Sequence, residues 1–395
     1  MSQPRFSFDG LFSQKSKNST PTVHAHAKYD FAVAYPDPES LPLSQLVDSL
    51  KSALDREGTD LAYYADSVGL QSLRKLIAEK LNKDRNMNIT EEDVVVTSGS
   101  GEAISMIIQA LTDPGDVILT EQFVYSGTLN QMKRYDADVR SVPCDESGII
   151  TNDLEAVIKN VISEGKIVKS LYTIPTFQNP MGWTMPVERR KEIISVCQKY
   201  GVPIFEDDCY FDLRFEGENV ESFYSLDDQK QTIYVGSFSK IIAPGMRLGY
   251  MIANESVRNR ACSFKSGATN TFASLAVEEF LSEHMYQHIE SQNTAFRQKR
   301  DSMLAALGEH LGSRAEWNQP EGGLYIWVKF PEGTDMEAFQ QTSFNEGVGY
   351  LNGKGYSPEG NGSNYVRLCF GHATVENCYQ GIVDFVKILE KHKII

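Results

Sequence analysis

One short segment of the chain combines an amine, two hydroxyls and a guanidinium: Lys240, Ser237, Ser239 and Arg247 lie within eleven residues. They follow the apolar, β-branched run 232–235, which predicts a buried strand. A lysine just past a strand end can stay partly desolvated, which lowers its pKa and lets its amine form a Schiff base with a carbonyl. The hydroxyls and the guanidinium suit a phosphate dianion. An aldehyde that carries a phosphate, such as pyridoxal phosphate, would engage all four side chains. The alternative is a solvated lysine in a serine-rich turn.

Two polar turns have the residues to complete such a site. In segment 97–103, between a predicted strand and a predicted helix, the small residues Ser100 and Gly101 would let backbone N–H groups approach an anion at the helix N-terminus. Asn179 stands before Pro180, which favours an extended backbone, and its amide could donate to a phenolate oxygen. Each turn also has a plainer interpretation, as ordinary glycine turn chemistry and as an Asn-Pro turn.

Two charged features stand where burial would be costly. The acidic trio 206–208 follows a predicted strand, and three adjacent carboxylates need something positive nearby. A protonated pyridine nitrogen would serve, because it keeps a pyridoxal ring an electron sink; a metal site or a solvated acidic turn are the alternatives. Arg367 lies in an apolar strand, where its planar fork suits a carboxylate ligand or an internal salt bridge.

Composition excludes several classes of protein. The 395-residue chain has a net charge of −15, which argues against a nucleic-acid partner. It has no apolar run near the roughly 18 residues of a membrane span. The 6 cysteines are scattered without a C-x-x-C pair, which favours reduced thiols in a cytoplasmic setting and argues against a disulfide framework or a zinc site.

Alternating short apolar strands and helices predict an α/β fold from about residue 70 to 255. Such a pattern gives a mostly parallel sheet with helices on both faces, and ligands bind at the carboxyl ends of its strands. After about residue 272 the pattern becomes α+β. We therefore predict an N-terminal arm over 1–45, a large ligand-binding domain over 46–290 and a small domain over 291–395, to which the N-terminal segment contributes. The predicted strands are 94–97, 117–119, 168–174, 202–205, 232–236, 248–253, 324–330 and 365–370, and the predicted helices are 70–81, 102–111, 187–200, 272–311, 334–346 and 374 onward.

Taken together, these motifs resemble those of the class I and II (fold-type I) aminotransferases, which depend on pyridoxal phosphate. The similarity is greatest to the branch that holds 2-aminoadipate and kynurenine aminotransferases and the catalytic domains of MocR-type regulators. The resemblance runs from about residue 31 to the C-terminus. It implies a three-layer α/β/α large domain and a smaller α+β domain built from both chain ends. The residues that carry it are Tyr63, Tyr64, Gly69, Leu73, Arg74, Gly99, Ser100, 113–116, 178–182, 206–208, 237–247 and Arg367.

The resemblance also implies roles for single residues. Lys240 would be the Schiff-base lysine, Asp207 would pair with the pyridine nitrogen and Tyr125 would stack on the ring. Tyr64 would reach the phosphate of a neighbouring subunit, which implies a homodimer with shared sites. The implied cofactor-binding residues are Tyr64, Ser100, Gly101, Glu102, Tyr125, Asn179, Asp207, Tyr210, Ser237, Ser239, Lys240 and Arg247. The implied substrate-binding residues are Ala34, Tyr35, Asn179 and Arg367.

The expected activity is transfer of an amino group between an L-amino acid and a 2-oxo acid such as 2-oxoglutarate. A lyase, cyclase or replacement enzyme on the same cofactor is the alternative, and a DNA-binding regulator is a weaker one because too few residues precede Phe31. The sequence departs from the family at Gly101, at Ala34–Tyr35 and at Asn352–Gly353. The last two flank the expected substrate pocket. Phe8, Phe12 and Tyr35 could line an aromatic pocket under an N-terminal lid over 6–12, or could simply dock the arm.

Overall fold

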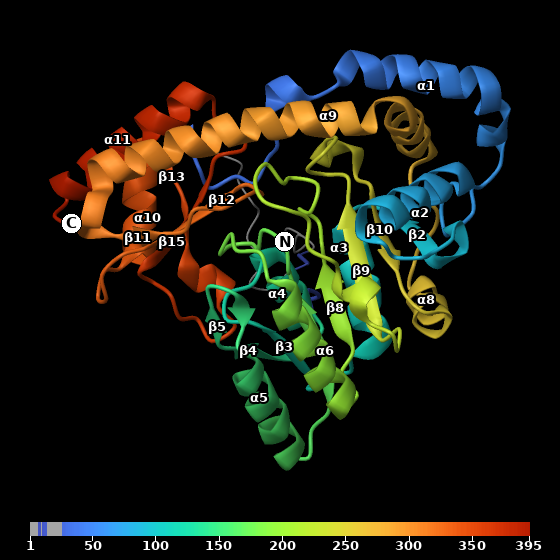
Figure 1. Ribbon diagram of the computed structural model, residues 1–395, viewed down its shortest axis with the longest axis horizontal. Coiled ribbons are helices and arrows are strands. Elements are labelled where there is room, and N and C mark those ends of the chain that lie inside the picture. The colour runs from blue at the N-terminus through green and yellow to red at the C-terminus, as the bar shows by residue number, and fades with distance from the viewer. Residues whose placement is uncertain (1–6, 9, 14–25) are drawn as a thin grey trace, which may run out of the picture.

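The computed structural model describes residues 7–8, 10–13 and 26–395. Two sheets lie toward opposite ends of one long helix, α9 (Thr271–Ala306), which runs across the top of the view in Figure 1. Part of the predicted N-terminal lid, residues 6 and 9, falls outside the described residues. Within the described ranges, no helix is both long and apolar enough to cross a membrane.

The larger sheet has seven strands in the order β2-β10-β9-β8-β7-β3-β4, and all pairs are parallel except the two that β10 makes. The predicted mostly parallel sheet is confirmed. The sequence analysis did not predict β4, an edge strand of mixed polarity. The strands are β2 (Val94–Thr97), β3 (Val117–Glu121), β4 (Asp138–Val142), β7 (Val168–Thr173), β8 (Ile204–Asp207), β9 (Thr232–Ser237) and β10 (Gly249–Ile252).

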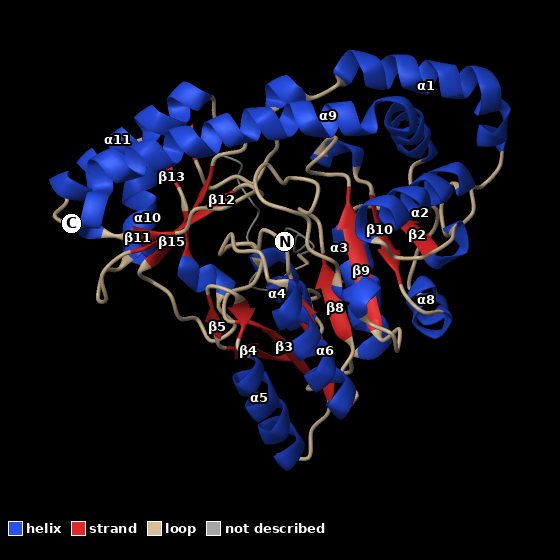
Figure 2. Ribbon diagram, in the orientation of Figure 1, coloured by secondary structure: helices blue, strands red, loops and turns tan. Residues whose placement is uncertain are grey.

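Strand alternation separates two hydrophobic cores, one on each face of this sheet. Successive residues of a strand point to opposite faces. Accordingly, Val117 and Leu119 pack in the core under α5 and α6, whereas Ile118 packs in the core that contains α2 and α3. The fold is therefore a three-layer α/β/α arrangement, as predicted (Figure 2). The helices of this part are α2 (Gln71–Arg85), α3 (Ser100–Leu111), α4 (Ser126–Arg134), α5 (Thr151–Ser163), α6 (Val187–Tyr200), α7 (Phe223–Leu226) and α8 (Glu255–Cys262).

A second, antiparallel sheet has the order β11-β12-β15-β14, and α10 and α11 accompany it. The N-terminal segment joins this part, because β1 (Tyr29–Asp30) pairs with β13 (Val348–Gly349). Helix α9 is continuous through residue 290, so it belongs to both parts. The remaining elements are α1 (Leu43–Glu57), β5 (Cys144–Asp145), β6 (Gly148–Ile149), β11 (Glu316–Trp317), β12 (Tyr325–Lys329), α10 (Met336–Asn345), β14 (Leu351–Asn352), β15 (Tyr365–Cys369) and α11 (Val375–Lys391).

The first turn of α3 packs tightly on β10, and a glycine permits it. A Cβ atom at Gly249 would lie 2.6 Å from the backbone nitrogen of Ser100 and 2.9 Å from the carbonyl oxygen of Gly236. Both neighbours are backbone atoms that cannot rotate away. Gly249 therefore fixes how closely the helix N-terminus approaches the sheet.

We predict that Gly249→Ala will lower the free energy of unfolding by about 1–3 kcal/mol, the usual cost of overpacking a core. Urea unfolding followed by circular dichroism measures this change. Gly355→Ala is the matched control, because a Cβ there meets nothing within 4 Å. Equal stability of Gly249→Ala and the wild type would contradict the close approach.

Candidate active site

Lys240 follows β9 in a turn, with its amine turned inward. Its Nζ donates to the carbonyl oxygen of Ala34 at 2.6 Å, and no carboxylate in the described part of the chain pairs with it. Burial lowers the pKa of Lys240, and the Arg367 and Arg247 cations act in the same direction. His288 of α9 hydrogen bonds the adjacent Ile241 carbonyl at 2.5 Å, which fastens the turn. The arrangement favours a neutral, nucleophilic amine.

Asp207 ends β8 with a buried side chain, 4% exposed. Its Oδ2 accepts a hydrogen bond from the Tyr172 hydroxyl at 2.5 Å. Its Oδ1 is buried and has no hydrogen-bond partner among the described residues. Burial raises the pKa of Asp207. A buried, unsatisfied carboxylate oxygen is costly, so this atom fits a donor such as a protonated ring nitrogen.

The other two members of the acidic trio are buried, which rules out a solvated acidic turn. Glu206 accepts from the backbone nitrogens of Phe223 and Tyr224 at 2.9 and 3.0 Å. Asp208 accepts from Arg85 at 2.5 Å through a fully buried ion pair. Asp207 and Asp208 thus each keep one buried oxygen without a partner among the described residues, but the other oxygen of Asp208 is held by Arg85 and Tyr234.

Arg367 lies in β15, 2% exposed, and it reaches from the small sheet into the site. Its Nη1 donates to Asn179 Oδ1 at 3.2 Å and its Nη2 donates to the Ala32 carbonyl at 2.5 Å. Its Nε is buried without a partner, and no carboxylate of the described chain forms an ion pair with it. The internal salt bridge considered from the sequence is therefore absent from the described residues. The guanidinium has capacity for an external carboxylate.

Asn179 connects Arg367 to Tyr210. Its Nδ2 donates to the Tyr210 hydroxyl at 3.1 Å, and both side chains are buried. The loop that carries Asn179 is anchored by Glu121, which accepts from Gln178 Nε2 at 3.1 Å. Further donors to Glu121 are Thr173 Oγ1 at 2.5 Å and the Ile174 nitrogen at 2.8 Å.

The N-terminus of α3 and Arg247 form an anion cradle. Arg247 Nη2 donates to the Ser98 carbonyl at 3.1 Å and would lie 2.6 Å from a Cβ at Gly99, the N-cap residue of α3 with φ +81°. Only a glycine fits there. The Glu102 carboxylate accepts from the Ser98 nitrogen at 2.6 Å, so its side chain closes this turn. At Gly101 a Cβ would face the Gln131 amide nitrogen at 3.6 Å, so α4 borders the space left by the missing side chain.

The remaining predicted residues lie as follows. The backbone N–H of Ser239, the residue before Lys240, donates a hydrogen bond to Ser237 Oγ at 3.1 Å. Tyr125 is the N-cap residue of α4, and its ring covers Gly127, where a Cβ would lie 2.6 Å away. Burial raises the pKa of Tyr125, with the charges of Arg367 and Asp207 close enough to influence it.

Tyr64 is not brought to the Lys240 site of its own chain. Its side chain is fully exposed and lines a separate groove with Asp60 and Arg74. Tyr35, 37% exposed, stacks edge-to-face on His372 at 5.7 Å. Ala34 is partly buried and touches Lys240 only through its carbonyl.

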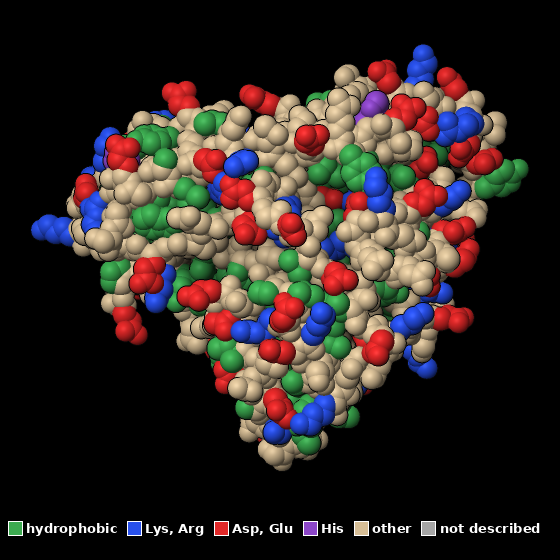
Figure 3. Space-filling view, viewed as in Figure 1, with side chains coloured by type: hydrophobic (Ala, Val, Ile, Leu, Met, Phe, Trp, Pro, Cys, Tyr) green, Lys and Arg blue, Asp and Glu red, His purple; other side chains and the backbone are tan. Residues whose placement is uncertain are grey.

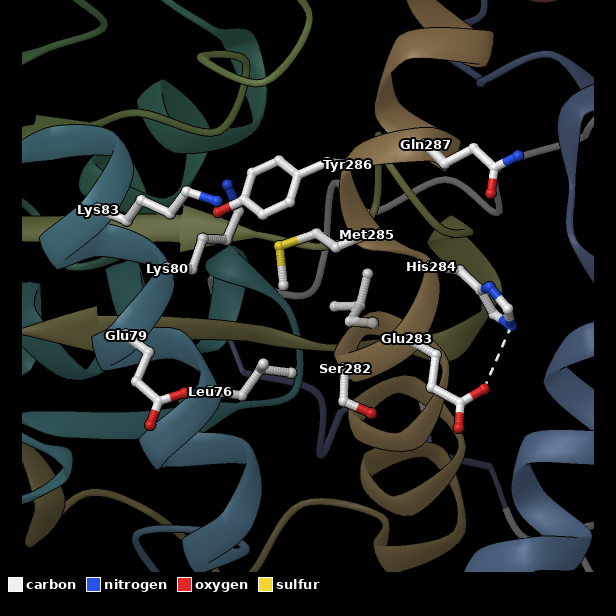
Figure 4. A pocket seen from close by; sticks show the side chains of 11 residues that line it. Leu76, Glu79, Lys80, Lys83, Ser282, Glu283, His284, Met285, Tyr286 and Gln287 are labelled. Carbon is white, nitrogen blue, oxygen red and sulfur yellow. Dashed lines mark ion pairs between the residues drawn. The ribbon is translucent and has the colours of Figure 1, made fainter.

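A groove between α2 and α9 carries several cationic side chains but none of the predicted site residues (Figure 4). Lys80 Nζ already donates to Asp84 and Asp212, and Lys83 lies 3.8 Å from the centre of the Tyr286 ring. Its cations are thus engaged within the protein. The described residues include no cluster of His, Cys, Asp or Glu that could hold a metal ion.

Sequence analysis missed three side chains that support the site: Glu121, Tyr172 and Tyr325. Tyr172 and Tyr325 lie in apolar strands, where a tyrosine is typical core material. Glu121 did leave a signal, because it is an acidic residue at the end of the otherwise buried β3. The hydroxyl partners depend on strand order, which no local pattern reveals.

Known proteins share this fold and this sequence pattern. Residues 34–382 match the family model of aminotransferase class I and II. Aromatic-amino-acid aminotransferase 1 of Thermococcus litoralis is 30% identical, over 98% of this chain and 96% of that protein. The structure superposes on the crystal structure of a multiple substrate aminotransferase from Thermococcus profundus, with a TM-score of 0.92, 29% identity, and coverage of 98% of this chain and 99% of that one. It also superposes on Pyrococcus horikoshii kynurenine aminotransferase in complex with PMP, kynurenine and its product, with a TM-score of 0.91, 28% identity, and coverage of 97% of this chain and 98% of that one.

The chain therefore belongs to the class I and II aminotransferases. It is an aminotransferase of fold type I that uses pyridoxal phosphate, as the sequence predicted. The residues at the site fit this cofactor, because Asp207 Oδ1, the Lys240 amine and the anion cradle offer an acceptor, a nucleophile and a phosphate site.

Burial raises the pKa of Glu121 to about 7, from an ordinary value of 4.5. The folded protein therefore binds the Glu121 carboxyl proton more tightly than the unfolded chain does. As a consequence, the wild type loses stability as the pH rises from about 4.5 to about 7. Glu121→Gln cannot ionise. We predict that the difference in urea midpoint, wild type minus variant, will fall across this window and level off above it. Parallel pH profiles would contradict the shifted pKa.

Proposed function

We propose that Lys240 is the amine that binds the cofactor aldehyde and later moves the Cα proton of the amino-acid substrate. The observation that carries this assignment is the inward Lys240 amine, which has a carbonyl partner, no carboxylate partner in the described chain, and a lowered pKa. Such an amine is neutral over more of the physiological pH range than an exposed lysine. It can therefore act both as nucleophile and as general base.

Asp207 is proposed to hold the proton on the ring nitrogen. When bound, pyridoxal phosphate supplies an electron sink for the Cα–H bond that breaks. Asp207 Oδ1 is the acceptor left for this proton, while Tyr172 fixes the carboxylate through Oδ2. Tyr125 is proposed to lie against the ring. Asn179 and Tyr210 are proposed to donate to its phenolic oxygen.

The phosphate is proposed to bind at the N-terminus of α3, a region of positive helix dipole. Its ligands would be Arg247 and the small residues that border it. We assign to this group Ser100, Gly101, Glu102 through its backbone, Ser237 and Ser239.

Arg367 is proposed to bind the substrate α-carboxylate. Its bonds to Asn179 and to the Ala32 carbonyl orient the fork, and its Nε keeps unused hydrogen-bonding capacity. The adjoining segment with Ala34 and Tyr35 would border the substrate side chain. A panel of aromatic, kynurenine-like and 2-aminoadipate donors with 2-oxoglutarate as acceptor defines the substrate.

The lyase, cyclase or replacement alternative is not favoured, because the relatives are named aminotransferases. Incubation with one amino acid and no acceptor separates the reactions. Stoichiometric conversion of the cofactor to its pyridoxamine form supports transamination, and continuous ammonia release would overturn it.

We predict that Lys240→Ala will lower kcat by more than about a thousandfold, because one side chain supplies both the nucleophile and the base. Borohydride reduction will also attach the cofactor covalently to the wild type but not to the variant, which the protein mass shows. Lys265→Ala is the matched control. The pKa of Lys265 is also lowered by burial and its amine also donates to carbonyls, at Ser67 and Gly267. Near-normal turnover of Lys240→Ala would refute the assignment.

We also propose a homodimer in which Tyr64 serves the phosphate site of the partner. Tyr64 is fully exposed and does not reach its own site. Apolar side chains are exposed on α1 and at the start of α9, where Leu43, Val47 and Phe272 line a groove that also contains Arg247 of the anion cradle. An apolar surface that adjoins the cofactor site is the kind that a second copy would cover.

Mixed dimers test this arrangement. A dimer of one Lys240→Ala subunit and one Tyr64→Ala subunit contains one site with both defects and one intact site, if Tyr64 acts across the interface. We predict that co-expressed, tag-separated mixed dimers will have about half of the wild-type kcat, whereas each parent homodimer is impaired. Mixed dimers no more active than the better parent would show that Tyr64 acts within its own chain.

Two further predictions stay proposals. We propose the division into an arm (1–45), a large domain (46–290) and a small domain (291–395), with α9 as the shared element at the second boundary.

We also propose a cytoplasmic location, because the 6 cysteines are all free thiols and burial raises the pKa of those at 144, 197, 369 and 378. The interspersed charges on the face in Figure 3 show no continuous basic stripe.

A further inference from the structure

We propose that the Tyr325 hydroxyl is a positioning group that orients the Tyr210 hydroxyl, so that Tyr210 donates its proton to the phenolic oxygen of the cofactor. Tyr325 is the first residue of β12 in the small sheet, so this group comes from a different sheet than the lysine and the aspartate. The inference rests on the proposed role of Tyr210 and adds a residue to the proposed site.

The geometry places Tyr325 against three groups of the site. Its hydroxyl oxygen lies 2.9 Å from that of Tyr210 and 3.4 Å from Asn179 Nδ2. Its ring centre lies 4.6 Å from the guanidinium carbon of Arg367. The two tyrosine rings meet edge-to-face at 5.5 Å, and Tyr325 is 1% exposed. A side chain packed this closely has a fixed hydroxyl position.

Proton counting gives the direction of the bond between the two hydroxyls. Each hydroxyl has one proton to donate. If Tyr210 donated to Tyr325, it would have no proton left for the cofactor. The Arg367 cation over the Tyr325 ring favours the opposite direction, because a positive charge makes the nearby hydroxyl a better donor. Tyr325 therefore donates to Tyr210, and the Tyr210 proton is left for the phenolic oxygen.

A chain of hydrogen bonds polarises each member, so a donor to Tyr210 makes Tyr210 itself a stronger donor. Tyr325→Phe removes that donor and keeps the ring over Arg367. Tyr210 then stabilises the phenolate less. With the cofactor bound, a more basic ring oxygen would raise the proton affinity of the imine that Lys240 would form.

The surrounding titratable groups do not obscure this readout. Around Tyr325 these are Tyr210 after β8, Arg367 and Cys369 on β15, and Tyr356 from the turn Gly353–Tyr356. Around Lys240 they also include Cys209 and Arg247. Burial raises the pKa of the Cys209 and Cys369 thiols and of the three tyrosine hydroxyls. Burial by itself would lower the pKa of Arg367, but the tyrosines and Cys369 that face it raise this pKa, so Arg367 stays charged.

The test is a pH titration of the visible absorbance of the holoenzyme. We expect Tyr325→Phe to increase the proton affinity of the Lys240–cofactor imine by roughly 3- to 10-fold, the effect of one hydrogen bond. Binding of hexanoate, a carboxylate without an amino group, should change by less than about twofold, because the ring still covers Arg367.

Tyr356→Phe is the matched control. The Tyr356 ring also lies over Arg367, at 5.4 Å, but its buried hydroxyl has no partner among the described residues. The titration midpoint of this variant should equal that of the wild type. In a Tyr210→Phe background, the further change Tyr325→Phe should have no effect on the midpoint, because Tyr325 acts through Tyr210.

Three results would overturn the inference: an unchanged midpoint in cofactor-loaded Tyr325→Phe, an equal shift in Tyr356→Phe, or a Tyr325 effect that persists without the Tyr210 hydroxyl. Thermal unfolding of each holoenzyme variant checks that it is folded. Failure of the proposed function is distinguishable, because Lys240→Ala would then keep the visible titration that the wild type shows.

Discussion

The hydrogen bond from Arg367 to Asn179 joins the two sheets of the molecule at one point. Arg367 is buried in β15 of the small sheet, and Asn179 lies in the loop that follows β7 of the large sheet. A buried guanidinium without a carboxylate is expensive, so its remaining donors must be satisfied by carbonyls, aromatic rings or a ligand. The whole site is arranged around that requirement. The Ala32 carbonyl and the Tyr325 ring meet part of it from elements far apart in the chain.

The acidic trio shows how burial gives three neighbouring carboxylates different roles. Asp208 pairs with Arg85 and Glu206 accepts from two backbone nitrogens, so both stabilise the region around β8. Asp207 forms no ion pair, and its Oδ1 has no hydrogen-bond partner among the described residues. A tightly packed scaffold can hold such an unsatisfied group in place, and this makes the site ready for a cationic partner.

Much of the fold followed from local pattern. The strand 94–97 and the helix 187–200 were predicted to the residue, because each combines strong periodicity with clear ends. The helices α1, α4, α5 and α8 and the edge strand β4 were not predicted. Helix α5 does have apolar residues at helical spacing, at 154, 157, 158 and 161, so the pattern was present there and was not used. The side-chain functions of Glu121 and Tyr172 were equally out of reach, because their partners come from neighbouring strands whose order is set by the complete sheet.

The sequence by itself determined the cofactor chemistry and the family. A lysine, two serines and an arginine in one turn can be recognised as a set without tertiary information, together with Asn179 after a strand, Asp207 at a strand end and Arg367 within a strand. Only the tertiary structure decided which of their atoms remain available. It left Asp207 Oδ1 and Arg367 Nε without partners among the described residues and kept Tyr64 away from the site of its own chain. It also brought Tyr325 to Tyr210. The physical reason is that residue type determines which partners a side chain can bind. Burial and the neighbours that folding supplies determine which of its hydrogen-bonding atoms are already paired and which remain available to a ligand.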